Sequence, residues 1–144
     1  MIGRCSAFRG KELFMKVRIF YHHTDCGGVV YYANYLKFLE EARTEFFEDR
    51  GLSMKALTDK DTLFVVARQE IDYKLPAVYG DILEVTSWVT ETSGVRVNFD
   101  AEIKKQTGQL VSKAKTFLVC VGRDLRPRPI PEDVKQKITG PETK

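Results

Sequence analysis

The stretch Thr24-Asp25-Cys26-Gly27-Gly28-Val29-Val30-Tyr31-Tyr32-Ala33-Asn34 carries most of the information in this chain. It places one carboxylate close before two glycines, and an apolar, aromatic run then leads into an amphipathic segment at residues 35–50. This pattern predicts an acid on a glycine loop, held against a helix start where backbone N–H groups lack partners and the macrodipole is positive. A carbonyl bound there meets a nucleophile or base on one side and hydrogen-bond donors on the other. The arrangement favours acyl chemistry.

The segment that follows the loop has the spacing of an amphipathic helix. Tyr35, Leu39, Ala42 and Phe46 follow one another at steps of four, three and four, which is typical of a helix with one buried stripe. Gly51 is the expected C-terminal stop of this helix.

Five other segments have the composition or alternation of β-strands. They are residues 16–21, 63–73, 81–92, 95–104 and 109–121. Strand, helix and four antiparallel strands, in that order, predict an α+β fold in which a five-stranded sheet wraps around one long helix. We expect a single domain at residues 15–138, with flexible tails at 1–14 and 139–144. Because one helix leaves a sheet edge exposed, we also expect a homodimer or homotetramer.

Bulk composition excludes several classes of protein. The 144 residues suit one domain, and 23 basic against 20 acidic residues give a net charge of only +3. This mild excess argues against a dedicated nucleic-acid binder. No apolar run approaches the ~18 residues of a membrane-spanning helix. Three cysteines (Cys5, Cys26 and Cys120) are odd in number and lack metal-ligand spacing, so a cytoplasmic location is expected.

The run Tyr21-His22-His23-Thr24-Asp25-Cys26-Gly27-Gly28-Val29-Val30-Tyr31-Tyr32-Ala33-Asn34-Tyr35 resembles the hotdog-fold acyl-CoA thioesterases. The resemblance is to the 4-hydroxybenzoyl-CoA thioesterase type and to the Tol-Pal-associated acyl-CoA thioesterases. It continues through residues 36–47 and, more loosely, through 67–81 and 126–134. The resemblance implies the hotdog fold, hydrolysis of acyl-CoA to a free acid and CoA without a metal or cofactor, and dimers that often pair into tetramers.

The same resemblance assigns roles within the loop. Asp25 is implied as the nucleophile or general base, whereas the residues alone leave it equally well a helix-capping acid. Gly27 and Gly28 allow the acyl carbonyl to approach the helix start, and the backbone N–H of Tyr32 corresponds to the oxyanion-hole donor. We count Val30 among the substrate-binding residues. Tol-Pal-associated relatives often have histidine at the position of Tyr32, which leaves the acyl preference open.

Four basic residues are candidates for binding the phosphates of CoA, because guanidinium and ammonium groups bind phosphate oxygens well. They are Arg126 and Arg128, which follow the last strand, and more weakly Arg96 and Lys113. A solvated basic surface is the alternative interpretation for each of them.

Three reactive side chains near Asp25 receive other interpretations. We expect His22 and His23 to be solvent-facing or locally hydrogen-bonded, because neighbouring strand residues point to opposite faces and two adjacent histidines make poor metal geometry. Cys26 is expected to be a small loop residue instead of a thiol nucleophile.

Two other functions remain open on this fold. One is a non-catalytic acyl-thioester-binding hotdog protein, and the other is a hotdog hydroxyacyl dehydratase. The choice between CoA and acyl carrier protein, and the length or aromatic character of the acyl group, are not specified by the sequence.

Overall fold

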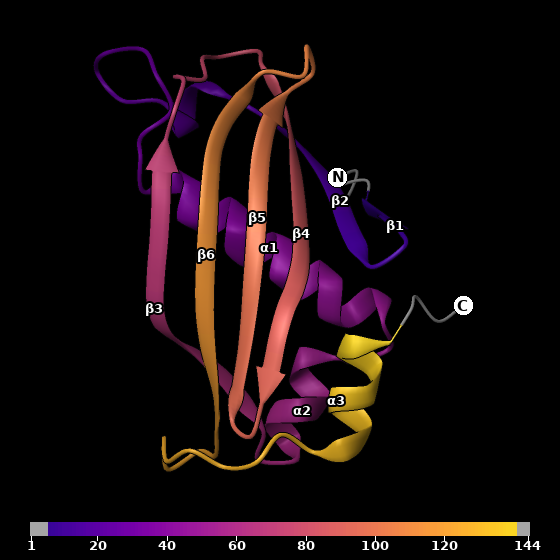
Figure 1. Cartoon of the computed structure of the whole chain (residues 1–144). Helices are drawn as coiled ribbons and strands as arrows, with labels where there is room; N and C mark the ends of the chain where they lie inside the picture. Colours follow the sequence, from indigo (N-terminus) through magenta and orange to yellow (C-terminus); the bar gives the residue numbers. More distant parts are fainter. Residues whose placement is uncertain (1–5, 141–144) are drawn as a thin grey trace.

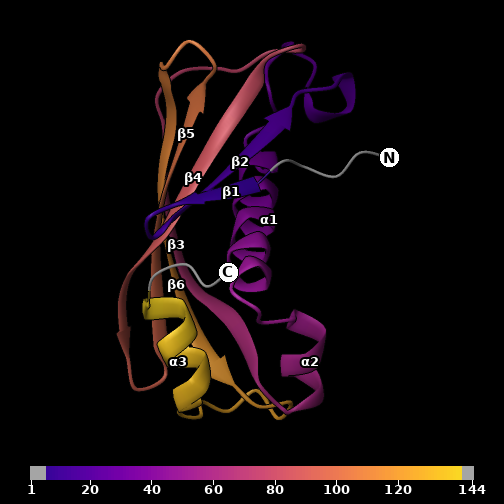
Figure 2. The same ribbon diagram turned by 90° about the vertical axis from the view of Figure 1, so that its right-hand side faces the viewer.

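The computed structural model describes residues 6–140, the side chain of Arg9 excepted. Six strands form one antiparallel sheet in the order β1-β2-β4-β5-β6-β3. The long helix α1 (Asn34–Asp49) crosses one face of this sheet (Figures 1 and 2). The strands are β1 (Ser6–Arg9), β2 (Glu12–Arg18), β3 (Leu63–Tyr73), β4 (Ile82–Ser93), β5 (Arg96–Lys105) and β6 (Leu110–Val121). The short helices are η1 (Tyr21–His23), α2 (Met54–Asp59) and α3 (Glu132–Thr139).

The sheet wrapped around one helix is confirmed, but it has six strands where the sequence predicted five. The additional strand β1 lies in the segment that we assigned to a flexible tail, and residues 12–14 of that segment begin β2. A turn at Gly10, whose φ of 64° suits glycine, folds β1 back onto β2. Residues 1–5, including Cys5, and residues 141–144 of the expected C-terminal tail lie outside the described part of the chain.

The core lies between α1 and the face of the sheet that α1 covers, called here the inner face. The predicted stripe of α1 is confirmed, because Tyr35, Leu39, Ala42 and Phe46 are at most 3% exposed. Alternate residues of β5 and β6 meet this stripe from the inner face. They are Val97, Phe99, Ala101 and Ile103 on β5, and Ser112, Ala114, Thr116 and Leu118 on β6.

The two ends of the sheet carry different parts of the chain. Tyr73 pairs with Ser112 at one end of β3, and Leu63 pairs with Val121 at the other. The loop between β2 and α1 lies at the Tyr73 end, whereas α2, α3 and the segment that leaves β6 lie at the Leu63 end (Figures 1 and 2). With 11 residues in β3, the two ends are roughly 33 Å apart at about 3.3 Å per residue.

Strand β3 forms an uncovered edge of the sheet. Val66 pairs with the buried Leu118 and so lies on the inner face, yet its side chain is 49% exposed. Its neighbour Val65 pairs with Val119 on the outer face and is 36% exposed. The register shifts between Val66 and Arg68, which leaves Ala67 as a bulge. Within residues 6–140, no helix is long and apolar enough to cross a membrane.

Candidate active site

Asp25 lies at the tip of a closed turn between η1 and α1. Its backbone N–H donates to the carbonyl of Val29 (2.9 Å), and its own carbonyl accepts from the N–H of Gly28 (3.0 Å). One carboxylate oxygen, Oδ1, accepts from the N–H of Gly27 at 2.8 Å. No donor among residues 6–140 bonds the other oxygen, Oδ2, and the side chain is exposed in the single chain. The turn therefore presents one unbonded carboxylate oxygen to the surroundings.

Both glycines have a geometric reason in this turn. Gly28 has a φ of 83°, in the left-handed region that side chains disfavour. A Cβ atom at Gly27 would lie 3.3 Å from Asp25 Oδ1, which is tighter than an ordinary van der Waals contact. A side chain at residue 27 would therefore press on the carboxylate that its backbone N–H now holds.

The start of α1, which follows the Asp25 turn in the chain, has no side-chain cap. The N-cap residue is Ala33, no side chain caps the helix, and its first turn holds no acid. Within the described part of the chain, neither the N–H of Tyr32 nor that of Ala33 meets an acceptor. Helices usually fill this position with Ser, Thr, Asp or Asn, and an alanine there costs about 0.5–2 kcal/mol. An uncapped helix start provides N–H donors for a ligand oxygen.

His23 holds the loop together instead of offering a base. Its ring is buried, packs edge-on against Phe38 (5.4 Å between centroids), and accepts the N–H of Phe20 at Nδ1 (2.9 Å). Its carbonyl accepts both the N–H of Tyr31 (2.9 Å) and the side-chain amide of Asn34 (2.8 Å). The expectation of a locally hydrogen-bonded His23 is thus confirmed, and His22 is exposed.

The cysteines lie in two different environments. Cys26 is exposed beside Asp25, and Cys120 is buried in β6. Burial raises the pKa of the Cys120 thiol above its ordinary value, against an opposing effect of Arg128. No cluster of three or more His, Cys, Asp or Glu side chains suited to a metal ion occurs among residues 6–140.

The candidate phosphate-binding arginines lie at the Leu63 end of the sheet, far from Asp25 within one chain. Arg128 donates to the carbonyl and carboxylate of Asp61. Arg126 is exposed, and its guanidinium bonds no acceptor in the described range 6–140. A single chain therefore does not bring Asp25 and these arginines together.

Arg96 and Lys113 point away from α1. Both lie on the outer face of the sheet, since Arg96 pairs with Val119 and Lys113 with Glu102 and Asp72. Lys113 lines a shallow hollow of about 320 Å³ together with both acids. Acidic neighbours on two strands make the surroundings of Lys113 unfavourable for a phosphate.

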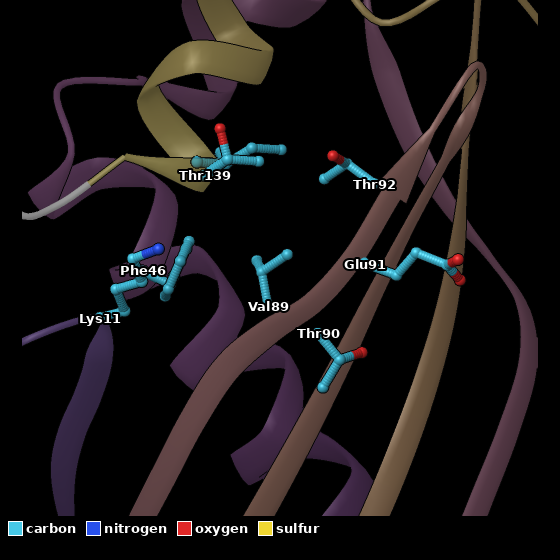
Figure 3. A pocket seen from close by; sticks show the side chains of 8 residues that line it. Lys11, Phe46, Val89, Thr90, Glu91, Thr92 and Thr139 are labelled. Atoms are coloured by element: carbon cyan, nitrogen blue, oxygen red, sulfur yellow. The ribbon is translucent and has the colours of Figure 1, made fainter.

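A second hollow of about 230 Å³ lies beside α3 (Figure 3). Apolar Phe46 and Val89 meet Thr139 there, and the Glu91 carboxylate is directed away from them (Figure 3). This hollow therefore lies at the Leu63 end of the sheet, where α3 is found (Figure 1). Asp25 lines neither hollow. Val30, the remaining candidate residue, is buried, and its N–H donates to the carbonyl of Ala77 at 2.8 Å.

Sequence reasoning missed Tyr73, which contacts a residue of the candidate site. Its hydroxyl donates to the carbonyl of Tyr32 at 3.1 Å, and its ring lies 5.6 Å from that of Tyr35. Tyr35 is itself buried, and this burial raises its pKa to about 12 against an opposing backbone hydrogen bond with Ala77. No local pattern could reveal the contact, because Tyr73 and Tyr32 are 41 residues apart.

Fold and loop together are those of the hotdog thioester hydrolases. The chain belongs to the thioesterase-like superfamily, whose sequence profile matches residues 21–138.

Bacterial relatives and a solved structure agree with this assignment. The acyl-CoA thioester hydrolase YbgC of Escherichia coli O6:H1 is 35% identical over 119 residues, which are 82% of this chain and 89% of the relative. The acyl-CoA thioesterase YbgC of Haemophilus influenzae is 37% identical over 121 residues, or 83% and 88% of the two chains. The crystal structure of a 1,4-dihydroxy-2-naphthoyl-CoA thioesterase from Synechocystis matches with a TM-score of 0.83 at 27% identity, covering 89% of this chain and 96% of that one.

Proposed function

We propose that this thioester hydrolase acts on acyl-CoA, with Asp25 as the reacting carboxylate and the N–H of Tyr32 as an oxyanion donor. The observation that carries the proposal is the uncapped start of α1, where the N–H groups of Tyr32 and Ala33 lack acceptors in the described chain. A helix start left open in this way leaves its N–H groups to water or to a ligand oxygen, and Tyr32 is exposed enough for a ligand to reach. The relatives named as acyl-CoA thioesterases supply the choice of CoA.

Two routes are open to Asp25. As a nucleophile, its carboxylate oxygen attacks the thioester carbon, the C–S bond breaks with loss of CoA thiolate, and water then hydrolyses the resulting anhydride. As a general base, it takes a proton from water, the hydroxyl adds to the carbonyl, and the C–S bond breaks as the sulfur receives a proton. Both routes pass through an oxyanion that backbone N–H groups stabilise.

The contacts of His23 disfavour the dehydratase alternative. Its Nδ1 is occupied by the N–H of Phe20 and its ring is buried, so this histidine is poorly placed to remove a substrate proton. A non-catalytic binder gains little from a carboxylate beside an electrophilic carbonyl.

The reacting unit in this proposal is a pair of chains. Pairing the β3 edge with a second copy about a two-fold axis extends the sheet and covers the inner-face side chain of Val66. Antiparallel pairing brings the Leu63 end of one copy to the Tyr73 end of the other. Arg126 and Arg128 of one protomer then approach Asp25 of its partner, where they can bind CoA phosphates. A tetramer is two such dimers, and a cytoplasmic location fits the exposed thiol of Cys26.

A hydrolysis screen tests the chemistry. The purified protein is assayed on acyl-CoA substrates from acetyl to palmitoyl and on benzoyl-CoA, with the released thiol measured. Asp25→Asn is expected to fold normally and to lower kcat by ~10²–10⁴, the range for loss of a positioned base. Cys26→Ser is the neighbouring control and should retain the parent kcat. An Asp25→Asn variant that hydrolyses acyl-CoA at the parent rate would falsify the assignment.

A further inference from the structure

Tyr73 ties the edge strand β3 to the first turn of α1. It is the last residue of β3, and its hydroxyl donates to the carbonyl of Tyr32 at 3.1 Å. The helix itself holds that carbonyl only weakly, because the N–H of Tyr35 lies 3.4 Å away. Typical N–H···O distances are about 2.9–3.0 Å and typical O–H···O distances about 2.7–2.8 Å, so both contacts are longer than usual, the Tyr35 one by more. Of the two hydrogen bonds that the Tyr32 carbonyl accepts, the one from the Tyr73 hydroxyl is the shorter.

The position of this hydroxyl is fixed by ring packing. The Tyr73 ring meets Tyr32 edge-on (6.2 Å between centroids) and lies 5.6 Å from Tyr35. Tyr35 is 3% exposed and belongs to the core. A phenol with the ordinary pKa of 10.0 is already a donor at neutral pH, and burial, then the neighbouring Tyr32, raise the pKa of Tyr73 further.

Because no side chain caps α1, the backbone around Tyr32 is held only by a few hydrogen bonds. The carbonyl before it, that of Tyr31, accepts the N–H of Asn34 (2.9 Å), which fixes one flanking peptide. The Tyr73 hydroxyl fixes the peptide on the other side. Because a peptide unit is planar, the Tyr32 carbonyl and the Ala33 N–H move together, so the Tyr73 hydroxyl sets the direction of the Ala33 N–H, while the Asn34 contact sets that of the Tyr32 N–H. Helix ends that lack such contacts fray.

We propose that Tyr73 is a positioning residue for thioester hydrolysis: its hydroxyl holds the Tyr32 carbonyl and so keeps the N–H of Ala33, in the same peptide, directed beside the Tyr32 N–H at the reacting carbonyl oxygen. The inference rests on the proposed function, since it assumes that the open N–H groups at the start of α1 stabilise the oxyanion. It also links the edge that a second copy covers to the reacting centre, because Tyr73 ends that edge strand.

The test compares two hydroxyl deletions. Tyr73→Phe keeps the ring and removes the donor. Tyr79→Phe is the matched control, because Tyr79 is equally exposed (45% for both) and stacks on Tyr21 at 3.9 Å. Its hydroxyl bonds no group in the described range 6–140. Tyr73→Phe is expected to lower kcat about 5- to 50-fold with KM within about twofold, because losing a whole oxyanion donor costs about 10²–10³. Tyr79→Phe should keep both parameters within about twofold.

Two further readouts separate positioning from a general structural role. Amide hydrogen exchange over residues 31–36 should accelerate about tenfold in Tyr73→Phe and not in Tyr79→Phe. Affinity for an S-alkyl-CoA thioether, which lacks the thioester carbonyl, should be unchanged in Tyr73→Phe. An unchanged kcat, unchanged exchange, or a thioether affinity that falls in step with kcat overturns the inference.

Asp25→Asn belongs in the same series. If it is slow while Tyr73→Phe matches the parent, the positioning role fails and the proposed function stands. If Asp25→Asn reacts at the parent rate, the proposed function fails first, and the positioning role fails with it.

Discussion

The guanidinium of Arg128 is held by Asp61, whose carbonyl and carboxylate both accept from the same nitrogen, Nη1. Asp61 lies in the turn before β3 and has a positive φ of 60°, which is uncommon outside glycine. Asp61 also accepts the backbone N–H of Arg123 at 2.7 Å. The contact therefore fastens the segment after β6 to the Leu63 end of the sheet, and the acid partly neutralises Arg128.

The two arginines should consequently differ in kinetic effect. Arg126→Ala is expected to raise KM for acyl-CoA about 3- to 10-fold with kcat nearly intact, because a contact remote from the carbonyl binds ground and transition states alike. Arg128→Ala should raise KM less and lower the melting temperature more. Kinetics at low and high salt check the assignment, since screening should shrink the Arg126 effect. An acyl-pantetheine substrate should show no effect, and an equal KM rise with it would assign Arg126 to the fold.

Assembly through β3 predicts opposite outcomes for two adjacent valines. Val66→Lys places a charge on the inner face of the edge, where the second copy is proposed to pack, and should shift the mass toward 16.5 kDa. Val65→Lys lies on the outer face of the same strand and should leave the mass unchanged. Light scattering at micromolar protein measures both. A parent mass near 16.5 kDa, or equal effects of the two lysines, contradicts the proposed interface.

Arg50 should be a large contributor to stability. It is 1% exposed, lies 4.4 Å from the Phe46 ring centroid, and donates to the carbonyls of Lys137 and Gly140. Arg50→Met removes these donors and should lower the free energy of unfolding by about 2–4 kcal/mol, since two part-buried carbonyls lose a charged partner and the contacts of the buried guanidinium are lost. Lys137→Met, an exposed change on α3, the helix whose Lys137 carbonyl Arg50 binds, should stay within about 0.5 kcal/mol. Denaturant unfolding distinguishes the two, and similar values for both variants would disprove the role of Arg50.

Stability at high pH should depend on Tyr35. Its folded pKa is about 12 against an ordinary value of 10.0, so the folded state keeps this proton after the unfolded state has lost it. The stabilisation is fully present below pH 10 and is lost as pH rises from 10 toward 12. The expected contribution to the slope is at most about 1.4 kcal/mol per pH unit. Unfolding titrations across this window should give a shallower slope for Tyr35→Phe than for the parent, and identical slopes would contradict the assignment.

Local patterns predicted the long elements well. The segment expected at residues 63–73 is β3 with the same bounds, and the helix expected from residue 35 begins at Asn34. Long elements can be predicted because burial of one face imposes a hydrophobic periodicity on many residues. Strand β1 is only four residues long and gains its partner from its own hairpin, so no periodicity marked it.

Contacts between distant segments were beyond the reach of the sequence. Asp61 and Arg128 are 67 residues apart, and the basic run around Arg128 was interpreted as a phosphate-binding or solvated surface. The Asp25 turn was easier to predict, because its acid and both glycines are neighbours in the chain and their hydrogen bonds are local. The contact of Tyr73 with Tyr32 joins residues 41 positions apart, so no local sequence pattern indicates it.

Asp25 and Arg126 lie at opposite ends of the sheet within one chain, and this separation has a consequence for dimers formed from two different variants. If each reacting centre takes its carboxylate from one protomer and its phosphate-binding arginine from the other, an Asp25→Asn chain and an Arg126→Ala chain are defective in different halves. Co-assembled, they form one centre with both native residues and one with neither. Mixing two impaired preparations should therefore restore hydrolysis with the parent KM, at up to half the parent turnover per heterodimer.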